Sequence, residues 1–362
     1  MQPEPVDHSA VDALIDWDLA TRAAGQLLRP GPQVGAQEAH DVVEQLRRLA
    51  AESTGYVAET TGLQARPGEG VLVVDRLGWV TANVDAFREL LGPPVAAVAA
   101  KREHQPGPIT QAVGSKVTGV ELGSLLAFLG SKVLGQYDVT GGVAAGAGTG
   151  RLLLVAPNVV QVERELDAEP DDFRLWVCLH EETHRVQFTA TPWLRDHLLA
   201  ETRSLVHALL GDPGQLGERL TAAARQLPEV LRGGDGTGLV ELVQTPEQRA
   251  AVARLTAVMS LLEGHADVVM DEVGPQVIPT VATIRERFTA RRAGSGAVDR
   301  VLRRLLGLEA KMRQYRDGAG FVRGVLAEVG MDGFNQVWAS PEALPRPEEI
   351  TDPGAWVRRV HG

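Results

Sequence analysis

The sequence predicts a mainly helical protein with a small β component. Along the chain, stretches with apolar residues three or four positions apart, the spacing of one helix face, far outnumber strand-like runs. Several of these stretches begin at capping residues or end at Gly and Pro. Two short apolar runs, residues 70–76 and 152–160, have the composition and the turn-forming boundaries of strands. These observations favour the α+β class with helices in the majority.

The first half of the chain contains a series of expected helices. The first two are separated by the turn-forming sequence RPGPQVG, and the third should stop at Gly92 because Pro93 and Pro94 follow it. The fourth is apolar with small residues, as in a buried helix or helix pair. These stretches are residues 9–30, 37–62, 84–92 and 107–135. The glycine-rich segment 141–150 lacks the G-K-[ST] ending of a phosphate loop, so we expect a loop before a strand.

The second half carries the clearest helix boundaries. Pro170 and the two aspartates after it suit a helix N-terminus, and the apolar run that follows predicts a buried helix. Another helix follows Pro192, and residues 211–245 are an insert rich in Gly and Pro. Thr245 is expected to cap a helix that runs to about Val273. The last expected helices are residues 297–316 and 319–329, with ends at Gly318 and Gly330.

Composition argues against several functional classes. The formal net charge is −11, and the Lys and Arg residues do not gather into a nucleic-acid-binding pattern. The single cysteine, Cys178, cannot form an internal disulfide, which fits a reducing compartment. The N-terminus lacks an apolar signal segment, and the stretch 123–135 is too short and too interrupted to span a membrane. We therefore expect a cytoplasmic protein without nucleic-acid or membrane partners.

Residues His180-Glu181-Glu182-Thr183-His184 form the H-E-x-x-H pattern next to the apolar run. On a helix, positions i and i+4 share one face, so both histidines can present ring nitrogens to one metal ion. Glu181 projects about 100° away from His180, where it can reach a metal-activated water as a general base. Ionisable residues in an apolar stretch are costly unless they are paired or used. The pattern therefore predicts a zinc site on this helix.

A catalytic zinc site needs a third protein ligand from outside this motif. The extension with a third histidine is absent, because Gln187 and Ala190 stand at its glycine and histidine positions. In the stretch MSLLEGHADVVMD, Glu263 and Asp267 lie four apart on one helix face. One carboxylate can bind the metal, and the other can accept the N–H of a metal-bound histidine. His265 projects to another side; we expect a core histidine there, and it stays an alternative ligand.

Three stretches of the chain together resemble one family of proteins. They are WVCLHEETHRVQF, LLEGHADVVMD and KMRQYRDGAGFV. The family is a zincin-like group of hydrolases and zinc-dependent metalloproteases that carries an association with biosynthesis of the deazaflavin coenzyme F-420. An H-E-x-x-H helix followed by a helix with E-x-x-x-D also resembles the gluzincin branch of zinc metallopeptidases. The likeness extends over most of the chain, from about residue 71 to residue 350.

The resemblance implies both a fold and a metal site. The fold is a zincin-like core with a small sheet beside the H-E-x-x-H helix and additional helices. We expect residues 1–66 to form an N-terminal helical region and residues 67–362 to form the catalytic domain, with the insert near 211–245. The resemblance further implies that His180, His184 and Glu263 bind Zn²⁺, while Asp267 supports one of the histidines through a hydrogen bond.

The leading functional hypothesis is a zinc-dependent hydrolase, most simply a peptidase, that acts on a peptide or another amide or ester substrate. Glu181 would take the proton of a zinc-activated water. Tyr315 is the first candidate to stabilise the oxyanion, with His207 and Tyr137 as alternatives. The strand at 152–160 either pairs with an extended peptide as an edge strand or lies inside the sheet. The alternatives are a non-catalytic binding or scaffold protein that keeps a zinc site, linked to deazaflavin coenzyme metabolism, and a metal-free helical protein of that metabolism.

Overall fold

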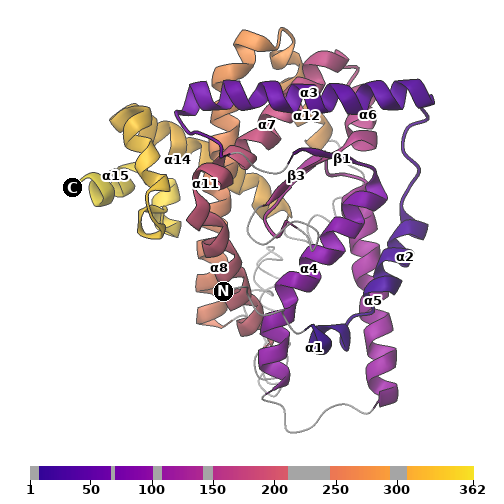
Figure 1. Ribbon diagram of the computed structural model, residues 1–362. Coiled ribbons are helices and arrows are strands. Elements are labelled where there is room, and N and C mark those ends of the chain that lie inside the picture. The colour runs from indigo at the N-terminus through magenta and orange to yellow at the C-terminus, as the bar shows by residue number, and fades with distance from the viewer. Residues whose placement is uncertain (1–7, 67–69, 101–107, 142–149, 211–244, 294–307) are drawn as a thin grey trace, which may run out of the picture.

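A three-stranded sheet lies between long helices in the computed structural model, which describes residues 8–66, 70–100, 108–141, 150–210, 245–293 and 308–362 (Figure 1). The strands are β1 (Leu72–Val74), β2 (Gly135–Asp138) and β3 (Arg151–Val155). The α-helices are α1 (Ser9–Asp12), α2 (Trp17–Leu27), α3 (Ala36–Thr61), α4 (Arg76–Ala99), α5 (Pro108–Gly130), α6 (Ala156–Glu165), α7 (Pro170–Ala190), α8 (Pro192–Leu210), α11 (Pro246–Val277), α12 (Val281–Ala293), α14 (Leu308–Phe334) and α15 (Pro353–His361). Short 3₁₀ helices follow α14, namely η1 (Asn335–Trp338), η2 (Pro341–Ala343) and η3 (Pro347–Thr351). The mainly helical class predicted from the sequence is confirmed.

The strand β3 is central in the sheet. It pairs in parallel with β1 and antiparallel with β2, in the order β1-β3-β2. The stretch 152–160 therefore begins as an internal strand and not as an edge strand. The strand ends at Val155 because Pro157, which lacks a backbone N–H and suits the first turn of a helix, lies at the start of α6. The short strand β2 was not predicted, because its sequence GQYD has no apolar alternation.

Alternate residues of β3 join two hydrophobic cores. Leu153 and Val155 pack into a cluster with α1, α2, α4 and α5, whereas Leu154 packs into a cluster with α3, α6 and α7. Figure 1 shows α3 lying across one end of the molecule, over α6 and α7. Because α3 shares its core with α7, packing continues across the boundary predicted at residue 66. No helix in the described ranges is both long enough and apolar enough to cross a membrane.

The helix α4 is longer than the sequence predicts. It begins at Arg76 because the carboxylate of Asp75 caps it, accepting a hydrogen bond from the Gly78 N–H at 2.7 Å. It also continues through Pro93 and Pro94, where a helix end was expected. Two prolines remove helical hydrogen bonds, but α4 packs against α5 and α8, and we attribute the continuation of the helix to this packing.

The helices α11 and α14 cross in backbone contact. A Cβ atom at Gly318 would overlap the Ser260 carbonyl, and a Cβ atom at Gly264 would overlap the backbone of Gly318. Gly318 is therefore a contact residue inside α14 and not the predicted helix end. Gly330 does interrupt α14, with a φ of 68°. The start of α11 at the Thr245 capping box is as predicted. Most of the predicted insert 211–245 and the first part of the helix predicted at 297–316 lie outside the described residues, and the rest of that helix is the beginning of α14.

The helix α7 is buried along most of its length. Arg174, which interrupts its apolar run, forms a buried ion pair with Glu163 of α6 through two hydrogen bonds of 2.9 and 2.7 Å. Asp172 in the first turn accepts hydrogen bonds from the backbone N–H and the hydroxyl of Thr280, which ties α7 to the start of α12. Cys178 is free and fully buried, and burial raises the pKa of its thiol, so it is not a reactive thiolate.

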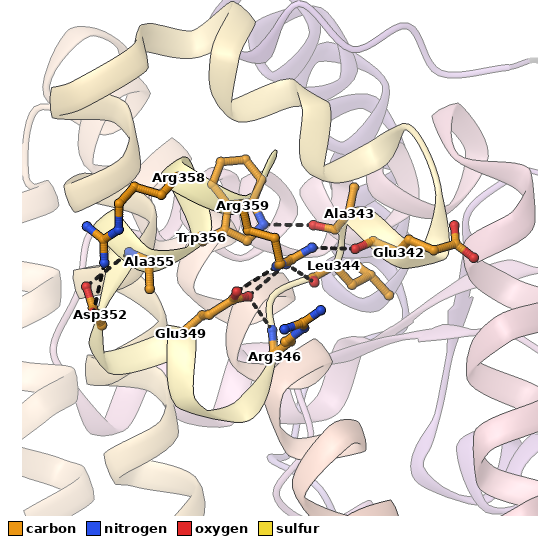
Figure 2. Close-up of polar contacts among 10 residues, drawn as sticks. All are labelled: Glu342, Ala343, Leu344, Arg346, Glu349, Asp352, Ala355, Trp356, Arg358 and Arg359. Carbon is orange, nitrogen blue, oxygen red and sulfur yellow. Dashed lines mark hydrogen bonds and ion pairs between the residues drawn. The ribbon is translucent and has the colours of Figure 1, made fainter. Parts of the chain in front are cut away.

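The C-terminal segment folds back against α11 and α14. The carboxylate of Glu349 in η3 accepts two N–H groups of Arg359 in α15, at 2.6 and 2.7 Å (Figure 2). Burial on its own raises the pKa of Glu349, but hydrogen bonds from Arg359 and from the Arg346 backbone outweigh burial and hold this pKa below its ordinary value. The fully buried Trp356 donates its indole N–H to the Ala343 carbonyl at 2.8 Å.

Candidate metal centre

The two histidines of the H-E-x-x-H motif lie one turn apart on α7, and their rings converge. The two Nε2 atoms are 3.3 Å apart, and the ring planes are nearly perpendicular, at 88°. The i, i+4 spacing of His180 and His184 therefore places both Nε2 atoms at one point, as the sequence predicts.

A carboxylate from α11 meets the two rings. Oε2 of Glu263 lies 3.5 Å from Nε2 of His180 and 3.7 Å from Nε2 of His184. Glu263 is buried, and its Oε2 has no hydrogen-bond partner within the part of the chain that the structure describes. These three side chains, predicted as the ligand set, form a group that could hold a metal ion.

The donor atoms fit a tetrahedral zinc site. Ligand atoms placed at about 2.0–2.2 Å from a tetrahedral zinc ion lie about 3.3–3.6 Å from one another. The three separations here are 3.3, 3.5 and 3.7 Å, and the donors are two imidazoles and one carboxylate. A buried carboxylate oxygen without a hydrogen bond is costly, and a cation at the centre of the triad would remove that cost.

The three groups also shift one another's protonation. Burial on its own raises the pKa of Glu263, but its contacts with both histidines outweigh burial and hold this pKa well below its ordinary value. Burial on its own lowers the pKa of His184, but the neighbouring Glu263 outweighs burial and raises this pKa to about 9. The cluster is thus electrostatically suited to a positive charge at its centre, whether that charge is a proton or a metal ion.

Glu181 lies beside the triad and packs against β2. It is only 7% exposed. A Cβ atom at Gly135 would lie 2.6 Å from both Cγ and Cδ of Glu181, so any larger residue at this position of β2 would push the Glu181 side chain away from where it lies. Nothing in the sequence indicated the role of Gly135, because the contact between β2 and α7 cannot be predicted from either segment alone.

The triad and Glu181 line one cleft of 680 Å³. Residues 133–137 of the β2 segment form one wall, and α7, α11 and α12 form the others. The cleft-lining residues of α7 extend from Trp176 at one end to Phe188 at the other. Phe188 stacks on Tyr137 of β2, with ring centroids 5.0 Å apart. The metal-binding face is therefore in the middle of a cleft with aromatic side chains towards both ends.

Comparison with known proteins agrees with this geometry. The profile of a family described as zincin-like metallopeptidases matches residues 15–357. The chain belongs to the zincin-like metallopeptidase family. Among solved structures, it is similar to a crystal structure of a candidate hydrolase with a novel fold from Chloroflexus aurantiacus, with 32% sequence identity and a TM-score of 0.67 over 96% of this chain and 99% of that chain. No curated protein matches the chain. The zincin-like resemblance is thus confirmed, whereas the association with coenzyme F-420 stays a prediction.

In this member of the zincin-like family, the partners of the two histidines differ from those predicted. Nδ1 of His184 faces Oε1 of Gln187 at 3.0 Å, and Nδ1 of His180 faces Sδ of Met270 at 3.3 Å. The position predicted for Asp267 is therefore taken by other side chains, and Asp267 lines the cleft instead. The reason is that Nδ1 of His184 faces the next turn of its own helix, and the spacing within α11 gives no information about that direction.

Sequence reasoning also missed the buried polar residues behind the triad. Gln187 is fully buried three residues after His184, and a polar side chain in an apolar stretch was the available signal. His265 was expected as a core histidine with satisfied hydrogen bonds; its ring is buried and its Nδ1 lies 3.0 Å from Nε2 of Gln187, but its own Nε2 has no hydrogen-bond partner among the described residues. Burial lowers the pKa of His265 to about 3, so its ring is neutral at ordinary pH.

The second glutamate of the motif points away from the cleft, towards α3. Glu182 is fully buried and accepts a hydrogen bond from Nε of Arg185 at 2.7 Å. Arg185 also donates to the hydroxyl of Thr54 on α3 at 2.8 Å. Adjacent glutamates on α7 therefore have separate roles, one in the cleft and one in the contact with α3.

The candidate oxyanion donors lie in different places. Tyr137 lines the cleft, but its hydroxyl lies against the backbone of Gly150, with which it forms a hydrogen bond. His207 is exposed on α8. The side chain of Tyr315, the first choice from the sequence, lies outside the described residues.

Proposed function

We propose that this protein is a zinc-dependent peptidase in which Glu181 is the general base. The observation that carries the proposal is that Glu181 lines the same cleft as His180, His184 and Glu263 without belonging to the ligand triad. A purely structural metal site has no use for a carboxylate at that position. Membership of the zincin-like metallopeptidase family supports the hydrolase class.

The residues of the cleft supply the proton transfers. A bound zinc ion would contribute Lewis acidity and would acidify a coordinated water. The Glu181 carboxylate accepts a proton from the attacking water and returns it to the leaving amine, as a carboxylate of suitable pKa does in general acid–base catalysis. Because Gly135 has no side chain, it leaves room for this carboxylate against β2. Burial of Glu181 strengthens its electrostatic interactions inside the cleft.

The position of β2 supports an extended peptide as the substrate. β2 pairs with β3 on one side, and its residues line the cleft. An extended peptide can add to such a strand through main-chain hydrogen bonds and pass in front of the triad. The strand proposed to pair with the peptide is therefore β2, and not the stretch 152–160 that the sequence suggested. Tyr315 remains the proposed donor to the developing oxyanion.

Activity and metal content together test the proposal. Protein purified without chelators should contain about one zinc ion per chain, and libraries of peptides, amides and esters should reveal a substrate. Glu181→Gln should keep the zinc and lose about 10²- to 10⁴-fold in kcat/KM, because the amide has no basicity. Glu182→Gln is the matched control, since it makes the same change one residue later on the α3 side.

Two results would argue against the peptidase. A Glu181→Gln variant as active as the parent would remove Glu181 from the reaction. A zinc-loaded parent that cleaves nothing in broad libraries would favour the scaffold alternative, in which the metal stabilises a binding surface.

A further inference from the structure

The buried polar residues behind His184 form a continuous chain of hydrogen bonds. Gln187 is fully buried and lies between α7 and α11. Its Oε1 is 3.0 Å from Nδ1 of His184, and its Nε2 is 2.9 Å from the Leu262 carbonyl and 3.0 Å from Nδ1 of His265. Every polar atom of this amide therefore has a partner.

The Leu262 carbonyl determines which way the amide lies. A carbonyl oxygen only accepts hydrogen bonds, so the amide atom that faces Leu262 must be the nitrogen. The amide oxygen of Gln187 must then face His184. Because that oxygen can only accept, Nδ1 of His184 must carry the proton. Once metal binding has released the second proton of this ring, Nε2 of His184 is unprotonated and directed at the centre of the triad, with its lone pair available to the metal.

His265 holds the other end of the chain. Its Nδ1 accepts from the amide nitrogen of Gln187, so the ring is neutral, with its proton on Nε2. The ring is buried, stacks on Phe334 with centroids 5.3 Å apart and meets Trp338 edge-on at 5.4 Å. These aromatic contacts fix the plane of His265, and His265 in turn fixes the amide of Gln187.

The other histidine of the triad lacks such support. Nδ1 of His180 faces the thioether of Met270, and sulfur is a weak acceptor. The side chain of His180 is also more exposed than that of His184, at 27% against 13%. Of the two histidines, His184 is thus the one whose orientation the protein determines more strongly.

We propose that Gln187 is a positioning residue, held by His265 and the Leu262 carbonyl, that fixes His184 as its Nδ1–H tautomer and presents Nε2 to the metal. This inference rests on the metal site of the proposed function. It assigns to Gln187 and His265 the support that the sequence assigned to Asp267. Partners of this kind typically change metal affinity by about 10- to 100-fold.

The first experiment measures zinc affinity by competition with a chelator. Gln187→Met keeps the length of the side chain and removes the strong acceptor and both donors, so zinc affinity should fall about 10- to 100-fold. Gln187→Glu keeps an acceptor for His184 but sets an oxygen against the Leu262 carbonyl, so it should recover part of that loss. His265→Phe keeps the ring stack on Phe334 and removes the acceptor for Gln187, so its loss should be smaller than that of Gln187→Met. Thr183→Val is the matched control, because Thr183 is equally buried and its hydroxyl bonds to its own helix, at the Leu179 carbonyl.

The second experiment observes the hydrogen bond itself. In zinc-loaded protein with ¹⁵N-labelled histidine, the Nδ1 proton of His184 should exchange slowly with water and give an observable NMR signal. Gln187→Met should make this proton exchange quickly, and Gln187→Glu should keep it protected. A residue with a purely structural role would lower the melting temperature without changing this signal selectively.

The outcomes separate the two proposals. Zinc binding and an Nδ1–H signal in Gln187→Met that match the parent would overturn the role of Gln187 and leave the peptidase proposal intact. Equal losses of zinc affinity in Gln187→Met, Gln187→Glu and Thr183→Val would show a general structural effect and would also overturn it. A parent protein that takes up no zinc would overturn the proposed function as well, before any variant is compared.

Discussion

The two helices that meet at the metal site are held in place in different ways. The helix α7 packs on α3 through large apolar side chains, and the buried group of Thr54, Glu182 and Arg185 adds hydrogen bonds between the two helices. The helix α11 instead touches α14 backbone to backbone, at Gly264 and Gly318. Side-chain packing positions the histidines, whereas a glycine contact positions the carboxylate.

This difference indicates how each ligand depends on its surroundings. Gly264 is the residue after Glu263, so the closest approach of α11 and α14 occurs beside the third ligand. A volume change at that crossing would displace Glu263 directly. The two histidines depend on the helical spacing of α7 and on the polar partners behind their rings, so they should tolerate volume changes better than changes of polarity.

The largest expected effect is the loss of the metal when either helix loses its ligand. His180→Ala and Glu263→Ala should each weaken zinc binding by more than about 100-fold, beyond the range for a supporting residue. Glu272→Ala, which removes an exposed glutamate from α11, should bind zinc like the parent. Zinc content and chelator competition provide the measurement. Tight stoichiometric zinc in either ligand variant would show that its helix does not contribute to the site.

The next effect tests the glycine contact. Gly318→Val would place side-chain atoms against the Ser260 carbonyl, where backbone cannot give way cheaply, so unfolding free energy should fall by about 3 kcal/mol. Zinc affinity should fall with it, because α11 must shift. Gly320→Ala is the control, since a Cβ there meets nothing within 4 Å and alanine favours the helix by about 0.5–1 kcal/mol. Denaturant titration that shows no difference between these variants would contradict the contact.

A smaller effect is expected from the C-terminal ion pair, because η3 packs against both α11 and α14. Glu349→Gln should lower the unfolding free energy at neutral pH by about 2 kcal/mol, the scale of a lost charged hydrogen-bond group. The folded-state pKa of Glu349 lies below its ordinary value of 4.5, so its contribution is present above that pH and is lost as the pH falls through the folded-state pKa. The stability difference between parent and variant should therefore shrink under acid. Glu348→Gln, which makes the same change at an exposed residue, is the control and should change the unfolding free energy at neutral pH much less than Glu349→Gln.

The comparison of α7 with α11 also explains how much could be predicted from the sequence. His180, Glu181 and His184 lie within five residues of one helix, so their geometry follows from helical periodicity alone. Glu263 needed a second argument, namely that a carboxylate on an apolar helix face requires a partner. The Thr245 capping box was likewise visible, because its signal is local.

The features that were missed depend on which segments meet. Gly318 was read as a helix end because a glycine can mark either a terminus or a close approach, and only the position of α11 decides between them. Gly330, by contrast, interrupts the helix in the structure, as the sequence predicts. Gln187 was noted only as a departure from another motif, since its partners Leu262 and His265 are more than seventy residues away in the sequence. Contacts of this kind between distant segments produce no regular spacing in the sequence from which they could be predicted.

The smallest expected effect is that of removing Asp267, which the E-x-x-x-D pattern predicts to hydrogen-bond a metal-binding histidine. Both Nδ1 atoms of the triad face other side chains, so removing this carboxylate leaves their contacts in place. Asp267→Ala should change zinc affinity by less than about 3-fold, well below the 10- to 100-fold loss expected when an orienting partner is removed. Asp267→Asn, which keeps the size of the side chain, separates charge from volume in the cleft that Asp267 lines. A 10-fold loss in both variants would mean that Asp267 of α11 orients one of the histidines after all. The conclusion that α11 contributes only the ligand Glu263, while the histidines of α7 are oriented by other side chains, would then be wrong.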